Sequence, residues 1–205
     1  MGKWMDGYLS RLKTLNKESL AGGGEERIEV QHSLGKLTAR ERIDRLADPG
    51  SFEELGSLVR NPYGHRMKTP KPGPGDGVAM GLAQINGRQV MVYSMDFTVM
   101  SGAIGDQGAW KIAELVQMAG QERLPLIGMI DSAGSRIGFK GGFTGLDGMG
   151  RLVRNYCLYS GIIPQITLLL GPCTGPLAQI PVLSDVLIMN ETTGFLWLGG
   201  DIASE

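Results

Sequence analysis

The residues best suited to chemistry follow a short apolar run, Pro125–Ile130, which is predicted to be a buried strand. The sequence there continues Asp-Ser-Ala-Gly-Ser-Arg, residues 131–136. A serine in such a turn acts as a nucleophile only beside a histidine base and an orienting acid. The chain has two histidines, one in the N-terminal helical region and one in a proline-rich loop, and it lacks a G-x-S-x-G elbow. We therefore disfavour Ser132 or Ser135 as a nucleophile, and the role of Asp131 stays open at this point.

A second predicted strand, Gln165–Leu170, also ends in small residues, here Gly-Pro-Cys-Thr-Gly-Pro at 171–176. Backbone N–H groups at two such strand ends could converge on one point and form an oxyanion hole. Alternatively, the small residues only permit tight turns. The spacing alone leaves both interpretations open.

Other chemistry is poorly supported by the residue types present. The two histidines and the two cysteines, Cys157 and Cys173, match no metal-ligand spacing and no disulfide framework. The glycine-rich stretch Gly138–Gly150 matches neither a P-loop nor a dinucleotide fingerprint, although it suits a loop beside a ligand.

Charge and hydropathy exclude further classes of protein. The formal net charge is -1, which argues against binding nucleic acid through its phosphates. No apolar run approaches 18 residues, and the first residues lack the apolar core of a signal peptide. We expect no membrane insertion, a reducing compartment and a cytoplasmic location.

The first 50 residues are predicted to be helical. Leucines recur at helical spacing before a break at Gly22–Gly24, and Thr38 with Glu41 predicts a capping box that opens a helix ending near Asp48. From Val78 onward, short apolar strands alternate with helices, which indicates an α/β layout with largely parallel pairing. The expected strands are 78–85, 88–94, 125–130, 165–170, 186–189 and 195–198, and the expected helices 106–119, 151–160 and 175–183. A doubly wound sheet and a ββα spiral both fit this spacing.

Several blocks of the sequence, in a single order, resemble the carboxyltransferase subunits (beta chain type) of biotin-dependent acyl-CoA carboxylases. They are GKLTARERIDRLADPGSFEEL (35–55), DFTVMSGAIG (96–105), DSAGSRI (131–137), RNYCLYSGIIPQI (154–166) and GPCTG (171–175). The resemblance covers nearly the whole chain from about residue 25.

The resemblance implies an α/β fold of the crotonase type, a ββα spiral preceded by an N-terminal helical extension. We expect the extension at 1–50 and an acyl-CoA-binding domain at 51–205, with the family's C-terminal crotonase-like domain absent from this chain. The implied reaction is transfer of a carboxyl group from carboxybiotin to the α-carbon of an acyl-CoA. The acyl thioester would become an enolate held by backbone N–H groups, and biotin itself would accept the proton.

By position, the resemblance assigns the two donors to the N–H of Ser135, after Gly134, and the N–H of Gly175. The neighbouring residues expected to contact the acyl-CoA are Ala133, Arg136, Thr174, Pro176, Gly105 and Trp110. Lys140, Arg151 and Arg154 are further candidates for the CoA phosphates, although solvated or paired charges explain them equally well.

This chain departs from the family pattern at three places. It has DSAGSRI where the family has DSGGARI, GPCTGPL where the family has GPCAGGA, and the bulky Trp110 where small residues are common. Proline has no N–H. A donor at Pro176 would therefore be lost, whereas a donor at Gly175 would remain.

The resemblance also implies partners. These are a C-terminal carboxyltransferase domain or subunit, a biotin carboxylase, and a biotin carboxyl carrier protein that bears the carboxybiotin. A homotrimer or hexamer is expected, and no bound metal. Two alternatives stay open: a carboxyacyl-CoA decarboxylase of the same superfamily, and a non-catalytic CoA-ester-binding subunit.

Overall fold

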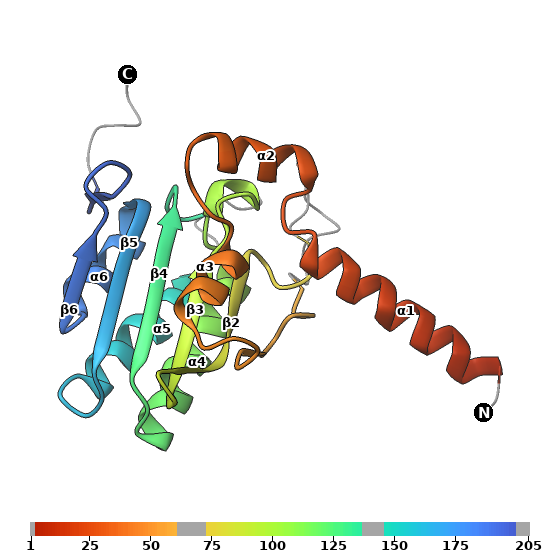
Figure 1. Ribbon diagram of the computed structural model, residues 1–205. Coiled ribbons are helices and arrows are strands. Elements are labelled where there is room, and N and C mark those ends of the chain that lie inside the picture. The colour runs from red at the N-terminus through yellow and green to blue at the C-terminus, as the bar shows by residue number, and fades with distance from the viewer. Residues whose placement is uncertain (1–2, 61–72, 137–145, 200–205) are drawn as a thin grey trace.

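The computed structural model describes residues 3–60, 73–136 and 146–199, and Figure 1 shows how their helices and strands are arranged. The helices are α1 (Lys3–Leu20), α2 (Glu25–Ser33), α3 (Ala39–Leu46), η2 (Met100–Gly102), α4 (Asp106–Glu122), α5 (Leu146–Tyr159), η4 (Gly175–Ala178) and α6 (Gln179–Leu183). The strands are β1 (Glu53–Glu54), β2 (Val78–Ile85), β3 (Arg88–Met95), β4 (Leu126–Ser132), β5 (Gln165–Thr174), β6 (Val186–Met189) and β7 (Phe195–Trp197).

The described strands form one sheet with the order β1-β2-β3-β4-β5-β6. The short strand β7 pairs with the carboxyl end of β5, after the residues of β5 that pair with β6. The first three strands are antiparallel. Asn86-Gly87 joins β2 and β3 in a tight hairpin, in which both residues have a positive φ. From β3 to β6 the pairing is parallel. The carboxyl ends of β3, β4 and β5 therefore lie along the same edge of the sheet.

Helices cover both faces of the sheet. On one face, α4 and α5 pack on alternate residues of the central strands, among them Tyr93, Ile130 and Leu169. On the other face, α3 packs Ala39 and Ile43 against residues such as Val92 and Met129. Successive side chains of a strand point to opposite faces. Because helices cover both faces of the sheet, β4 is buried along its whole length.

The N-terminal helices differ in how they meet this core. The predicted capping box is confirmed: the Thr38 side chain accepts from the Glu41 N–H, and the Glu41 side chain accepts from the Thr38 N–H. It opens α3, which is part of the packed core. Helix α1 extends away from the body, and α2 lies beyond the carboxyl end of β4 (Figure 1).

Several predicted boundaries are wrong in an informative way. Helix α5 begins at Leu146, inside the stretch expected to be loop, and residues 137–145 of that stretch lie outside the described residues. Helix α4 runs through Gly120, where it was expected to stop, because the missing side chain leaves room for the Tyr159 ring. Both β4 and β5 extend into the turns that were predicted to follow them.

Candidate functional site

The two strand ends singled out by the sequence lie side by side. Strands β4 and β5 are parallel neighbours, and Ser132 pairs with Cys173 at their carboxyl ends. The Thr174 hydroxyl then donates a hydrogen bond of 2.7 Å to the Ala133 carbonyl oxygen. This bond joins the two turns directly.

Gly134 permits this close approach. Its φ is +105°, a conformation that side chains rarely adopt. A Cβ at this position would also lie 2.5 Å from the Thr174 hydroxyl oxygen and 3.0 Å from the Thr174 carbonyl oxygen. Both the backbone conformation and the packing therefore require glycine here.

The N–H of Ser135 is directed away from Ile104, the residue with which Ser135 forms a β-bridge. The Ile104 N–H donates to the Gly134 carbonyl at 2.8 Å, and the Arg136 N–H donates to the Ile104 carbonyl at 2.7 Å. In such a parallel bridge, the backbone groups of Ser135 itself point away from Ile104. The Ser135 N–H has no hydrogen-bond partner among the residues that the structure describes.

Gly175 lies in the other of the two turns. It has a φ of +63° and is the first residue of η4, so its N–H has no acceptor within the helix. Thr174, directly before it, pairs with Trp197 at the end of the parallel β5–β7 ladder. Pro176 follows and cannot donate.

The side chains at the strand ends are unsuited to nucleophilic attack. Ser132 is fully buried, and its hydroxyl donates to the Gly102 carbonyl at 2.7 Å while it accepts from the Gly134 N–H at 3.1 Å. The imidazole of His32 lies instead 2.9 Å from the Glu41 carboxylate. Burial raises the pKa of Cys173 to about 12, so its thiol stays protonated at neutral pH.

Asp131 is held by residues from the N-terminal segment. Its side chain is fully buried, and its carboxylate accepts from Lys36 at 2.8 Å, from Arg42 at 2.6 Å and from Gln31 at 3.2 Å. Gly171 on β5 leaves room for this carboxylate, because a Cβ there would overlap it. We call these four residues, Gln31, Lys36, Arg42 and Asp131, the Asp131 cluster.

Arg136 is buried with a carboxylate of its own. Its guanidinium lies 2.6 Å from Asp76, and only 2% of its side chain is exposed. It also donates to the Ala103 carbonyl, and a Cβ on Gly105 would lie 2.6 Å from one of its nitrogens. This placement gives Arg136 and Gly105 structural contacts behind the turn, away from solvent.

Trp110 and two arginines lie on the outer surface of α4 and α5. The Trp110 indole N–H donates to Asp147 at 3.1 Å, and the Arg151 guanidinium stacks 3.7 Å above the Trp110 ring. Arg154 donates to Asn155 and, with Arg151, lines a cleft of about 430 Å³. Lys140 lies outside the described residues.

A larger cleft opens next to the turn, between α2 and residues 97–101. Its volume is about 500 Å³, and its lining combines apolar side chains with polar groups of α2. Met100 and Ser101 in its wall both have a positive φ, which is a strained conformation for residues other than glycine. The Ser101 carbonyl accepts from the Ala133 N–H at 2.9 Å, so the wall is bonded to the turn.

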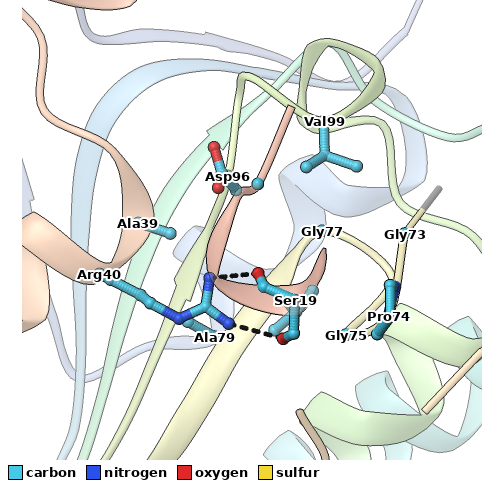
Figure 2. A pocket seen from close by; sticks show the side chains of 12 residues that line it. Ser19, Ala39, Arg40, Gly73, Pro74, Gly75, Gly77, Ala79, Asp96 and Val99 are labelled. Atoms are coloured by element: carbon cyan, nitrogen blue, oxygen red, sulfur yellow. Dashed lines mark hydrogen bonds between the residues drawn. The ribbon is translucent and has the colours of Figure 1, made fainter. Parts of the chain in front are cut away.

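A third cavity, between the end of α1 and the body, is too small for a substrate. Figure 2 shows Arg40 donating to the carbonyl and the hydroxyl of Ser19, beside Gly75 and Asp96. The cavity measures about 10 Å³, which is at most the space of one water molecule. It is a junction that fixes the end of α1.

The described residues contain neither a metal-binding cluster nor a membrane-spanning helix. Among residues 3–60, 73–136 and 146–199, no three His, Cys, Asp or Glu side chains are grouped to hold a metal ion. In the same ranges, no helix has the length and apolar character needed to cross a membrane.

Comparison with known proteins identifies the family. The model of the carboxyl transferase domain matches residues 30–204. The chain belongs to this family. Its fold matches that of a solved carboxyl transferase, transcarboxylase 12S, with a TM-score of 0.87 and 37% identity over 97% of this chain and 38% of that chain. The predicted crotonase-like α/β class is thereby confirmed.

Named relatives within the family include a carboxylase and a decarboxylase. The chain is 41% identical over 201 residues to the propionyl-CoA carboxylase beta chain of Cereibacter sphaeroides. It is 38% identical over 185 residues to the methylmalonyl-CoA decarboxylase subunit alpha of Propionigenium modestum. The matches cover 96% and 90% of this chain but only 38% and 35% of the relatives. The chain thus spans little more than a third of the length of these carboxyl transferase relatives.

The structure brings together most, but not all, of the predicted site residues. Ala133, Gly134, Ser135, Thr174 and Gly175 meet at the two strand ends, whereas Trp110 lies on the outer helical surface. The Asp131 cluster was missed. A carboxylate directly after a fully apolar strand was the available signal, because a buried charge needs a partner.

Proposed function

We propose that this chain is the acyl-CoA-binding part of a carboxyltransferase that moves a carboxyl group from carboxybiotin to the α-carbon of an acyl-CoA. The observation that carries the proposal is the pair of strand-end turns joined by the Thr174–Ala133 hydrogen bond. The backbone N–H groups of Ser135 and Gly175 belong to these turns, and that of Ser135 has no partner among the described residues.

The proposed role of these two groups is to stabilise negative charge. Loss of the α-proton places charge on the thioester oxygen, and two fixed donors hold that oxygen more strongly in the enolate than in the ground state. In the transfer, the bond between the carboxyl carbon and the biotin nitrogen breaks, a carbon–carbon bond forms at the α-carbon, and the α-proton passes to biotin. No side-chain base of this chain is needed for that step.

The cleft between α2 and residues 97–101 suits the rest of the substrate. Its volume lies within the range of small-molecule sites, and its wall is bonded to the turn that carries the Ser135 N–H. The first relative is named for propionyl-CoA, and transcarboxylase 12S was solved with methylmalonyl-CoA bound. We therefore propose a short-chain acyl-CoA as the substrate.

The proposed assembly follows the family. A C-terminal carboxyltransferase domain or subunit would complete the site, and a separate carrier would present the biotin. Transcarboxylase 12S is described as a hexamer within a multienzyme core, which supports a homo-oligomer here.

The decisive experiment measures ATP- and biotin-dependent incorporation of labelled bicarbonate into propionyl-CoA by the complete carboxylase that contains this chain. We expect incorporation and saturable binding of the CoA ester. Absence of both from the folded, assembled protein would refute the proposal.

A decarboxylase is the second candidate, because a relative of similar identity is named as one. The same oxygen-binding turns serve the reverse reaction, since it passes through the same enolate. Release of CO₂ from methylmalonyl-CoA, without ATP-driven incorporation, would favour this direction.

A further inference from the structure

The Asp131 cluster carries more positive than negative charge. Lys36 and Arg42 both contact the single carboxylate of Asp131, and the third donor, Gln31, is neutral. The exposed fractions of the three charged side chains are 10%, 5% and 0%. One of the Arg42 terminal nitrogens, Nη1, is buried without a hydrogen-bond partner among the residues that the structure describes. One buried positive charge is therefore left uncompensated by the groups in contact.

This excess charge is unexpected for a purely structural contact. Buried charge is expensive, and one cation would suffice to neutralise Asp131. Lys36 also lies 4.3 Å from the centre of the Phe97 ring, and Phe97 lines the cleft beside the turn. The second cation therefore adds an energetic cost and lies between the cleft and the strand end.

The cluster is also coupled to the proposed oxygen-binding turn through the backbone. Asp131 lies at a register shift in β4, next to Ser132 and four residues before Ser135. Gly102 packs directly on the Asp131 carbonyl, and the Ser132 hydroxyl donates to the Gly102 carbonyl. Gly102 thus contacts both Asp131 and Ser132 at the start of the turn.

We infer that Lys36 is a positioning residue for the carboxyl transfer, acting through Asp131. With Arg42 it fixes the strand end that aims the Ser135 N–H, and it leaves a net positive charge behind the turn that favours the enolate. The inference rests on the proposed function and extends it, since it assigns to the N-terminal segment a part in the chemistry.

The test compares Lys36→Met, Lys36→Arg and the control Lys17→Met, a substitution of an exposed lysine on α1. Each is measured in the complete carboxylase with propionyl-CoA. At an effective dielectric constant of about 20, a unit charge about 10 Å from the charge that develops in a reaction changes the rate of that reaction by roughly 10-fold. We expect Lys36→Met to lower kcat about 10-fold with less than a threefold change in KM. Lys36→Arg should keep at least half of kcat, and Lys17→Met should match the wild type.

Stability separates this role from a purely structural one. Removing Lys36 leaves Asp131 and Arg42 as a balanced pair, so we expect the midpoint of thermal unfolding to change little. A Lys36→Met protein that keeps the wild-type kcat would overturn the inference. So would a kcat loss that Lys36→Arg fails to restore. If Lys36→Met does not fold, Lys36→Gln, which keeps a hydrogen bond to Asp131, replaces it under the same criteria. An inactive wild-type enzyme would instead refute the proposed function.

Discussion

Among single residues, Gly134 has the most direct link between conformation and proposed chemistry. Its positive φ and its contact with Thr174 both exclude a side chain. Gly134→Ala must displace the Ser135 N–H. We expect kcat/KM to fall by roughly 100-fold or more, as for the loss of an oxyanion donor. Steady-state kinetics of the complete carboxylase measure this loss.

Gly150 provides the matched control. It lies within α5, it is not among the residues with a positive φ, and no atom stands within 4 Å of a Cβ placed there. Gly150→Ala should leave kcat/KM unchanged and raise the free energy of unfolding by up to about 1 kcal/mol. Equal activity of Gly134→Ala and Gly150→Ala would contradict the role assigned to the turn.

Pro176 tests which residue of the second turn is the donor. If the Gly175 N–H is the working group, Pro176→Gly restores an N–H that the reaction does not use. We therefore expect kcat to change by less than about threefold, within the range of a loop substitution away from the reacting atoms. A gain of 10-fold or more would show that the missing N–H at position 176 limits this protein, and it would favour the non-catalytic alternative for the natural chain.

For whole elements, sequence patterns predicted the existence of the helices and strands better than their ends. Two apolar runs joined by Asn86-Gly87 identified β2 and β3 together with their turn, because a hairpin is a local structure. The ends of β4 and β5 were missed because they continue the sheet through long-range pairing, of Ser132 with Cys173 and of the last residues of β5 with β7. No local pattern reports that pairing.

The candidate site likewise combines features that the sequence predicted with features that it did not predict. The two turns were predicted from residues adjacent in sequence to apolar strands, and their contact follows from parallel pairing. In the Asp131 cluster, Arg42 lies 89 positions from Asp131 in the sequence, and Gln31 lies 100 positions from it. Periodicity and spacing contain no information on contacts over such separations, although a buried carboxylate implies that some cation must reach it.

Helix α4 allows a test of how packing overrides a helix-stop signal. Gly120 lies inside α4 because its missing side chain accepts the Tyr159 ring of α5. Gly120→Ala should therefore destabilise the protein by about 1–3 kcal/mol, despite the higher helix propensity of alanine. Denaturant unfolding measures this change. Tyr159→Ala combined with Gly120→Ala should cost less than the sum of the single changes, and strict additivity would argue against the contact.

For the whole molecule, two apolar surfaces stay exposed in the described chain. Trp4, Tyr8 and Leu12 recur at four-residue intervals along α1, and each is at least 44% exposed. The strand β6 exposes Val186, Ile188 and their neighbours at the edge of the sheet. Contiguous apolar surfaces of this kind mark protein interfaces. They are consistent with the homo-oligomer and the additional carboxyltransferase domain proposed above.

The pH dependence of folding stability reports on the buried groups of the whole molecule. Lys111 donates to the carbonyls of Gly75 and Val78, and burial lowers its pKa from 10.5 to about 8 despite the nearby carboxylates of Glu54 and Asp76. Between pH 8 and 10.5 the unfolded chain holds a proton that the folded chain has lost. The contribution of Lys111 to stability therefore rises with pH in this window, by at most about 1.4 kcal/mol per unit.

Other buried groups act in the opposite direction, so the test must isolate Lys111. Burial raises the pKa values of Tyr93, Tyr156 and Cys173, whose contributions fall as the unfolded chain loses protons above about pH 9. We compare the wild type with Lys111→Met by denaturant unfolding from pH 7 to 10. The variant should be less stable throughout, because two carbonyls lose their donor, and its deficit should widen between pH 8 and 10. A deficit that stays constant or shrinks with pH would mean that Lys111 keeps its proton in the folded protein, and that the charge balance around Asp76 and Glu54 outweighs its burial.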